Sequence, residues 1–346
     1  MEFVEVDGSQ GEGGGQILRT AVAFSAIKKV PVKIARIRAG RDVPGLKRQH
    51  VTSLRVLAGA FSGRLEGARE GSPEVSFVPG EPVQERMQLD TGTAASITLV
   101  LQAVIPAVAL SGARLSLKLV GGTDVPWSPT FDYFQRVAAE GYRAVGISAR
   151  VEAARRGYYP RGGGEVTAEV EPSRGVVPLT LVSRRAVSSA KVVSRCGGLP
   201  REVAERQSAA AAAELSGRGI AVDEAEALDG PSDSPGTSVL VYRAGEGVII
   251  GSDSIGAKGK PAEDVGHEAA RGFAAAEESG GCLDANLADM LLPLLSLAAG
   301  PSLVKVPALT SHLETGLRLA SQFTGCQWKA EREGNGVLVE VDPKNR

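Results

Sequence analysis

The sequence contains few of the residues that build disulfide frameworks, metal centres and aromatic binding surfaces. Its 346 residues include three cysteines, three histidines and only 4% aromatic residues. The cysteines are odd in number, widely spaced and without a CxxC pair, so neither a disulfide framework nor a cysteine metal site is indicated, and a reducing cytoplasm is expected. The low aromatic content leaves few stacking platforms, which argues against a generic RNA-binding module.

The chain also lacks an excess of either charge and a long apolar run. Its 39 basic and 40 acidic residues exclude a generally basic nucleic-acid coat, so any nucleic-acid site must be local. The most apolar run, 94–110, is interrupted by polar residues and a proline, which is typical of a buried helix rather than a membrane span. The first residues do not resemble a signal peptide. We expect a soluble cytoplasmic protein without a membrane partner.

The predicted elements recur three times in one order. Strand, helix, strand, helix and two strands are indicated at 3–6, 16–27, 32–38, 46–61, 64–66 and 74–78. The order returns at 88–90, 94–110, 114–120, 131–145, 147–153 and 164–170. From 285 onward it returns at 287–299, 303–306, 312–323, 327–332 and 336–341. This repetition predicts an α/β (α+β) fold in which three βαβαββ units form one large domain.

The spacing of the repeats predicts an insertion. The first helices of the units are expected to begin near residues 16, 94 and 286, so the steps between them are 78 and 192 residues. The extra residues in the second step suit a smaller βαβββα domain inserted between repeats two and three. The predicted bounds are 1–183 and 281–346 for the large domain and 184–280 for the inserted one.

His312 is the first candidate for chemistry. It falls where a loop after a predicted strand turns into a helix, with Thr310 and Ser311 as N-cap candidates and Glu314 placed for a capping box. Backbone N–H groups at such a helix start attract phosphate oxygens and favour neutral imidazole, so His312 is suited to attack phosphorus. The alternative is an ordinary capping or surface residue.

Two segments near the N-terminus suit an anionic ligand. The glycine-rich loop 11–16 leads into a helix, where backbone N–H groups can approach a phosphate, although a tight structural turn is the alternative. Glu12 in this loop is better suited to be a metal ligand or a base. A basic cluster follows, and the proline and glycines of its loop favour an anion site over a solvated basic face. The cluster consists of Arg36, Arg38, Arg41, Lys47, Arg48 and His50, after Arg19 on the preceding helix.

Two further polar residues lie within predicted helices. Gln102 falls in the apolar run, where a buried amide must bond to backbone or face a ligand. Asp289 lies near the start of the helix 287–299, where an interaction with the helix dipole is the simple explanation.

Five motifs in this order resemble the RNA 3′-terminal phosphate cyclase family, namely GSQGEGGGQILR, IRAGR…PGLKRQH, TLVLQ, GGTD…P and LAD…LLP…HLET. The resemblance covers the whole chain and implies the same three repeats with a smaller inserted domain. It also implies the ATP-dependent conversion of an RNA 3′-terminal phosphate into a 2′,3′-cyclic phosphodiester. The implied route passes through a covalent histidine–AMP and an RNA-adenylate, with release of pyrophosphate and AMP.

The resemblance also implies roles for individual residues. His312 stands in the family's His-Leu-x-Thr context and corresponds to the attacking histidine, and Glu12 corresponds to the residue near the metal, Mg²⁺ or Mn²⁺, and the triphosphate. The ATP-site motifs correspond to Gln102, Asn286, Leu287, Ala288, Asp289 and Met290, with Pro129 against the adenine. The polar cluster around the phosphates corresponds to Arg19, Arg38, Arg41, Gln49 and His50. The family commonly has an aromatic residue or histidine in place of Asn286 and a glutamine in place of Met290, so two nucleotide contacts differ here.

Two other classes compete with a cyclase. Close relatives of the cyclases serve ribosome assembly and rRNA processing without catalysis and lack the nucleophilic histidine, so His312 argues against them. Enolpyruvyl transferases resemble the repeat architecture and bind phosphorylated metabolites, but they need no histidine nucleophile.

The sequence favours a cytoplasmic cyclase whose partner is RNA with a 3′-phosphate end, as a monomer or a homodimer. The inserted domain either helps to hold RNA or stabilises the fold, and its His267 is expected to be solvated.

Overall fold

Three four-stranded sheets repeat one topology. The computed structural model describes residues 2–11, 14–82, 86–245 and 247–343. The strand orders are β1-β2-β4-β3, β5-β6-β8-β7 and β9-β14-β16-β15. In each sheet the first two strands of this order are parallel, and the remaining neighbours are antiparallel. The same order in three stretches of the chain confirms the predicted α/β fold with repeated units.

The elements of the repeats lie close to the predicted ranges. The first repeat has β1 (Val4–Asp7), α1 (Gly15–Lys28), β2 (Val32–Ala35), α2 (Arg48–Ala60), β3 (Arg64–Glu66) and β4 (Val75–Val78). The second has β5 (Arg86–Asp90), α3 (Ile97–Leu110), β6 (Leu115–Gly121), α4 (Phe131–Tyr133), a π-helical turn (Phe134–Ala138), α5 (Ala139–Ala144), β7 (Ala149–Arg155) and β8 (Gly164–Val170). β2 ends three residues early because Arg36 and Arg38 have positive φ angles of 55° and 54°, which no extended strand accommodates.

The third repeat is divided by the insertion. It has β9 (Thr180–Leu181), then α8 (Ala285–Leu291), a 3₁₀ turn (Leu292–Leu297), β14 (Ser302–Val306), α9 (Ser311–Thr324), β15 (Gln327–Glu333) and β16 (Gly336–Asp342). β9 pairs in parallel with β14, as β1 does with β2. The insertion therefore lies inside the third repeat, after its first strand, and not between repeats two and three. The sequence did not reveal β9 because two residues are too few to produce a periodic pattern.

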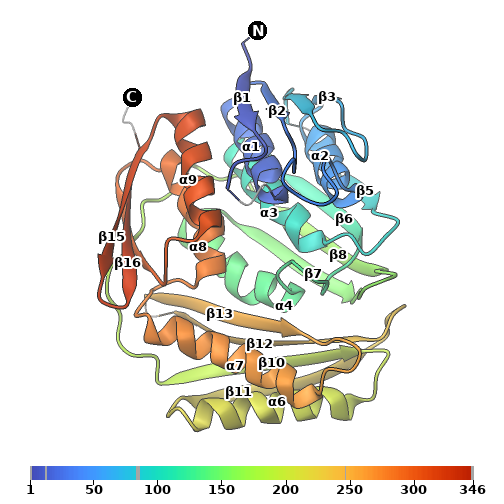
Figure 1. Cartoon of the computed structure of the whole chain (residues 1–346), viewed down its shortest axis with the longest axis vertical. Helices are drawn as coiled ribbons and strands as arrows, with labels where there is room; N and C mark the ends of the chain where they lie inside the picture. Colours follow the sequence, from blue (N-terminus) through green and yellow to red (C-terminus); the bar gives the residue numbers. More distant parts are fainter. Residues whose placement is uncertain (1, 12–13, 83–85, 246, 344–346) are drawn as a thin grey trace.

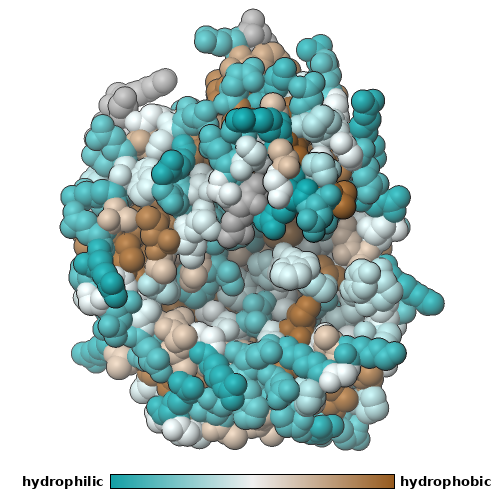
Figure 2. Space-filling view, viewed as in Figure 1, coloured by the Kyte–Doolittle hydropathy of each residue, from teal (hydrophilic) through white to brown (hydrophobic). Residues whose placement is uncertain are grey.

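The inserted part has the predicted βαβββα order. It consists of β10 (Ser189–Gly197), α6 (Arg201–Ser216), β11 (Ala221–Gly230), β12 (Gly236–Gly245), β13 (Val248–Ile255) and α7 (Ala262–Glu278). The two helices cover one face of the sheet β11-β10-β12-β13 and bury a small apolar core of their own (Figure 1). The lower end of the view in Figure 2, where these helices lie, carries mainly hydrophilic side chains. His267 of α7, which we expected to be solvated, is half-buried, and its Nδ1 lies 3.1 Å from a carboxylate oxygen of Glu214 on α6.

The helices of the three repeats meet in the interior, with the sheets around them (Figure 1). α1 packs against both α3 and α9, so that one apolar core joins all three repeats. α3 is apolar on nearly every side and is buried along almost its whole length, as we expected of the run 94–110. Within the described part of the chain, no helix is both long enough and apolar enough to cross a bilayer.

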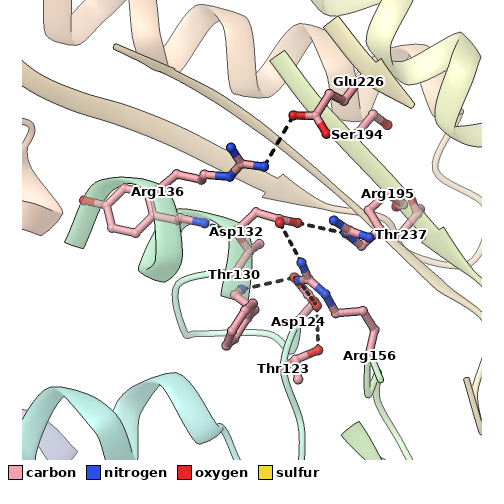
Figure 3. Close-up of polar contacts among 12 residues, drawn as sticks. Thr123, Asp124, Thr130, Asp132, Arg136, Arg156, Ser194, Arg195, Glu226 and Thr237 are labelled. Carbon is pink, nitrogen blue, oxygen red and sulfur yellow. Dashed lines mark hydrogen bonds and ion pairs between the residues drawn. The ribbon is translucent and has the colours of Figure 1, made fainter. Parts of the chain in front are cut away.

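A buried ionic network joins the insertion to the second repeat (Figure 3). The guanidinium of Arg156 lies 2.6 Å from a carboxylate oxygen of Asp132 and 3.2 Å from one of Asp124. Arg195 of β10 approaches the second oxygen of Asp132 at 3.3 Å. Burial opposes the charge of Asp132, but Arg156 and Arg195 outweigh it and hold the pKa of this carboxyl below its usual value. Every member of the network thus has a partner of opposite charge.

Candidate active site

One cavity collects side chains from all three repeats. Its volume is about 640 Å³, and its walls come from α1, α2, α3, the loop before α4, α8 and α9. Most of the residues predicted for an active site line it, namely Arg19, Arg38, Arg41, Gln49, His50, Gln102, Pro129, Asn286, Asp289, Met290 and His312. Residues nearly 300 positions apart in the chain therefore face one space.

Three predicted residues are not among those that line the cavity. Leu287 and Ala288 are fully buried in the core. On a helix, positions 286, 289 and 290 share one face, so the two residues between them point away from it. Their placement holds the cavity-facing side of α8 in position. Glu12, the predicted metal ligand, lies outside the described residues.

His312 is the second residue of α9, and three contacts hold its backbone in place. Thr310 is the N-cap, and its hydroxyl accepts a hydrogen bond from the N–H of Leu313 at 2.9 Å. The same hydroxyl donates to Asp289 of α8 at 2.7 Å, so Asp289 has a structural contact as well as a cavity-facing position. Gln16 of α1 donates from Nε2 to the carbonyl oxygen of His312 at 3.1 Å. The start of α9 is therefore fixed to the helices of two repeats.

The expected capping box is absent. With Thr310 as N-cap, the third helical position is Leu313, and Glu314 lies one residue too far along the helix to reach back. Glu314 instead accepts a hydrogen bond from Arg318, one turn later, at 2.6 Å. The Glu314 side chain is therefore paired along the helix and does not reach back to its start.

The first repeat supplies a basic wall. Arg19 has no described carboxylate within ion-pair distance, and burial lowers its pKa to about 10, so that it stays protonated at neutral pH. Arg38 is 8% exposed and donates to the carbonyl oxygens of Val43 and Gly45 at 2.7 and 3.2 Å. Burial, and then the charge of Arg41, lower the pKa of Arg38. Cations held out of water without a carboxylate favour the binding of an anion.

His50 is held neutral beside these cations. Its Nδ1 accepts a hydrogen bond from the backbone N–H of Lys47 at 3.1 Å, which leaves the proton on Nε2. Burial, followed by the charges of Arg19, Arg38 and Lys47, lowers the pKa of His50 to about 3. A Cβ at Gly15 would overlap the Nε2 atom, so the glycine-rich loop needs glycine here to approach the ring.

The remaining wall is mainly apolar. It is formed by Leu99, Ala103 and Pro106 of α3 around Gln102, and by Met290, Pro293 and Leu294 of the third repeat. Pro129 closes the wall, and its carbonyl oxygen accepts a hydrogen bond from the hydroxyl of Thr98 at 2.9 Å. A charged end and an apolar end in one cavity suit a ligand that has both phosphates and a flat base.

The cavity also includes residues that sequence reasoning did not assign to a site. Gln16 and Lys47 lie directly beside predicted site segments, and this adjacency was a signal that could have identified them. Trp127 lies two residues before Pro129, in the loop between β6 and α4, which by itself gave only a weak motif. Tyr142 contributes from α5 and had no sequence signal, because only the fold brings its hydroxyl within 3.5 Å of the carbonyl oxygen of Gln102 on α3.

The described residues do not by themselves form a metal site. Asp289 is the one carboxylate among those that line the cavity, and one of its oxygens already accepts a hydrogen bond from Thr310. No group of three or more potential metal ligands occurs among the residues that the structure describes. A divalent ion at this cavity would need ligands beyond these side chains, such as phosphate oxygens of a substrate.

Comparison with known proteins gives a family and close relatives. The family model for RNA 3′-terminal phosphate cyclase matches residues 10–330. The RNA 3′-terminal phosphate cyclases of Pyrococcus furiosus and Thermococcus gammatolerans are both 41% identical to this chain. The alignments cover 93% and 99% of this chain and 94% and 98% of those proteins. A solved structure of EPSP synthase from Acinetobacter baumannii aligns with 95% of this chain and 62% of that one, at 10% identity, and its TM-score of 0.30 is too low to carry an argument.

Proposed function

This chain belongs to the RNA 3′-terminal phosphate cyclase family, and we propose that it uses ATP to convert the 3′-phosphate end of RNA into a 2′,3′-cyclic phosphodiester. The observation that carries the proposal is the arrangement of one cavity. His312 at a helix start shares this space with the cations Arg19 and Arg38 and with an apolar wall. These are the features that nucleophilic transfer of a nucleotide requires.

In the first step, an imidazole nitrogen of His312 attacks the α-phosphorus of ATP. A phosphorus–nitrogen bond forms, the bond from the α-phosphorus to the bridging oxygen breaks, and pyrophosphate leaves. The imidazole then loses its N–H proton to solvent, so that its ring is neutral and the phosphoramidate, histidine–AMP, keeps one negative charge on its phosphoryl oxygens. A covalent intermediate divides one difficult transfer into easier steps.

In the second step, an oxygen of the RNA 3′-phosphate attacks the same phosphorus. The phosphorus–nitrogen bond breaks, the imidazole recovers a proton, and the RNA end is now an adenylate. In the third step the vicinal 2′-hydroxyl attacks the 3′-phosphorus and loses its proton, and AMP leaves. Adenylation is needed because a phosphate monoester by itself has no good leaving group.

The two walls of the cavity bind different parts of ATP, the basic wall the triphosphate and the apolar wall the adenine. Arg19, Arg38 and Arg41 offset the charge of the triphosphate, and neutral His50 donates a hydrogen bond from Nε2. Gln49 contributes polar contacts at the same end. The adenine lies against the apolar wall, where its contacts are Gln102, Pro129, Asn286, Asp289 and Met290. Leu287 and Ala288 act by supporting this face of α8 from the core.

Mg²⁺ or Mn²⁺ remains part of the proposal as a cofactor that offsets phosphate charge. The described side chains offer no complete ligand set, so no step above passes through a metal. The three cysteines are free and buried, which suits a reducing cytoplasm. RNA with a 3′-phosphate end is the proposed partner, and the protein acts either as a monomer or as a homodimer.

The testing experiment separates the first step from the others. Purified protein is incubated with α-labelled ATP and a divalent metal, without RNA, beside a His312→Ala variant of the same fold. Label that stays on the denatured wild type, is lost in acid and persists in base indicates a phosphoramidate. If the folded wild type takes up no label with any divalent metal, the nucleotidyl mechanism is wrong, and the non-catalytic ribosome-assembly class becomes the better explanation.

A further inference from the structure

The aromatic side chains are almost all removed from solvent, with two exceptions that lie on neighbouring segments. Trp127 is 98% exposed and Tyr159 is 68% exposed, whereas the other aromatic side chains of the described residues are buried or half-buried. The segments that carry the two are neighbours, because Asp124 and Tyr158 form a parallel β-bridge. In a chain with so few aromatic residues, two exposed aromatic side chains on neighbouring segments indicate a binding surface.

The loop of Trp127 is rigid although its indole is free. Trp127 has a φ of 68°, a left-handed conformation that is strained for a bulky residue. Two hydrogen bonds fix the loop directly after Trp127. The hydroxyl of Thr98 bonds to the carbonyl of Pro129, and the N–H of Thr130 donates to Asp253 of the insertion at 2.6 Å. Such a support holds the indole outward at the rim of the cavity that it also lines.

The turn that carries Tyr159 adds a positive charge. Of the arginines in this segment, Arg155 pairs with Asp233, and Arg156 belongs to the buried network. Arg161 is exposed, and no described carboxylate lies within ion-pair distance of it. Its backbone N–H donates to the hydroxyl of Ser234 at 3.2 Å, so a loop of the insertion holds the turn in place. Aromatic faces beside a free cation are what single-stranded nucleic acid binds.

We propose that Trp127, Tyr159 and Arg161 form an RNA platform outside the cavity. The terminal base of the RNA stacks on Trp127, and the next nucleotide lies against Tyr159 with its phosphate at Arg161. This inference deepens the proposed function and rests on it. The insertion contributes by fixing both segments, through Asp253 and Ser234, and not by a basic surface of its own.

The indole suits RNA better than it suits the adenine of ATP. The apolar wall of Pro129, Met290 and Leu294 already offers an enclosed place for one base. Trp127 is exposed on nearly its whole surface. It is therefore placed to contact the part of a substrate that extends out of the cavity, not the part that fills it. The second substrate is a chain that must leave the cavity, because only its end reacts.

Fluorescence tests the stacking directly. The chain has two tryptophans, so a Trp328→Phe variant reports on Trp127 alone. We expect a short RNA with a 3′-phosphate, added without ATP, to quench this emission, and ATP alone to leave it nearly unchanged. Quenching by ATP and not by RNA would assign the indole to the adenine and overturn the proposal, as would the absence of quenching by either.

Substrate length tests the order of contacts. Trp127→Ala is expected to raise the KM for RNA roughly fivefold or more, on a ten-nucleotide RNA and on a dinucleotide 3′-phosphate alike, while Trp127→Phe keeps most of the affinity. Tyr159→Ala and Arg161→Ala are expected to act on the longer RNA and much less on a mononucleotide 3′-phosphate. Arg161→Ala also reduces the slope of log affinity against log salt by roughly 0.7.

Self-adenylation distinguishes this inference from the proposed function. Tyr159→Ala and Arg161→Ala are expected to take up label from ATP at the wild-type rate, because neither residue lines the cavity. If the wild type forms no labelled enzyme, the proposed function fails. If it does form labelled enzyme but the three variants use the ten-nucleotide RNA as well as the wild type does, the platform alone is wrong.

Discussion

Two groups of buried or half-buried arginines in this molecule have opposite surroundings. At the junction with the insertion, Arg156 and Arg195 are paired with Asp132, and Arg156 also with Asp124 (Figure 3). In the cavity, Arg19 and Arg38 are held out of water without a described carboxylate. Both groups cost free energy to desolvate, but only the first is offset within the chain.

This difference separates structural charge from binding charge. A buried ion pair that is complete holds two segments in register and has no capacity left for a ligand. A buried cation without a counter-ion destabilises the folded chain. When an anionic ligand binds, its charge offsets this desolvation free energy, and binding is stronger for that reason. Arginine therefore has a structural role at the junction with the insertion, whereas in the cavity it indicates a binding site for an anion such as phosphate.

The largest expected effect comes from removing His312, the proposed nucleophile, which lines the cavity together with Arg19 and Arg38. His312→Ala should abolish label transfer from ATP and lower RNA cyclisation by at least about a thousandfold, because the proposed phosphorus–nitrogen bond forms on its imidazole. A folded variant with the thermal transition of the wild type provides the control. Appreciable cyclisation by this variant would show that the histidine is not the nucleophile.

Among these substitutions, removing an arginine that is paired with buried carboxylates should lower the stability of the protein most. Arg156→Met leaves Asp124 and Asp132 buried with fewer counter-charges, so the free energy of unfolding should fall by about 3–5 kcal/mol. Denaturant titration of both proteins measures it. A loss below about 1 kcal/mol would mean that the network is not the buried, complete one that the geometry indicates.

The matched substitution of an arginine in the cavity should weaken the binding of ATP and not the stability of the protein. Arg19→Met removes a largely desolvated cation that has no described carboxylate as a partner, so the free energy of unfolding should stay the same or rise. The KM for ATP should increase about tenfold or more, as expected when a charged hydrogen bond of about 1.5–3 kcal/mol is lost. Equal destabilisation by Arg19→Met and Arg156→Met would remove the distinction between the two groups.

The last effect concerns His50, whose pKa is lowered by burial and then by the neighbouring cations. The pKa is about 3 in the folded protein and about 6.5 unfolded, so the unfolded chain binds the extra proton between these values. Stability is therefore fully present above pH 6.5 and lost as the pH falls toward 3. At pH 5 the loss from this group is about 2 kcal/mol.

A His50→Gln variant should lack this part of the acid destabilisation. Denaturant titrations at pH 7 and pH 5 compare it with the wild type, and Gln49→Ala serves as a neighbouring control that keeps the wild-type difference. An identical pH dependence in His50→Gln and the wild type would contradict a depressed pKa at this position.

Much of the fold could be predicted because its signals are local. The periods of helices and strands are visible within each stretch of about eighty residues. The order of elements was therefore recovered in the first two repeats, in the insertion and in the third repeat apart from its first strand. β9 was not recovered, because its identity depends on pairing with β14 more than a hundred residues later. The position of the insertion within the third repeat followed only from that contact.

The sequence by itself determined which residue types recur in order along the chain, and hence the family and the predicted set of site residues. The tertiary structure alone decided which of them share a cavity, that Leu287 and Ala288 face the core, and that Trp127 is exposed at the rim. It also decided which arginines have a partner. Periodicity and motifs act between neighbours in the chain, whereas desolvation and ion pairing depend on segments that only folding brings together.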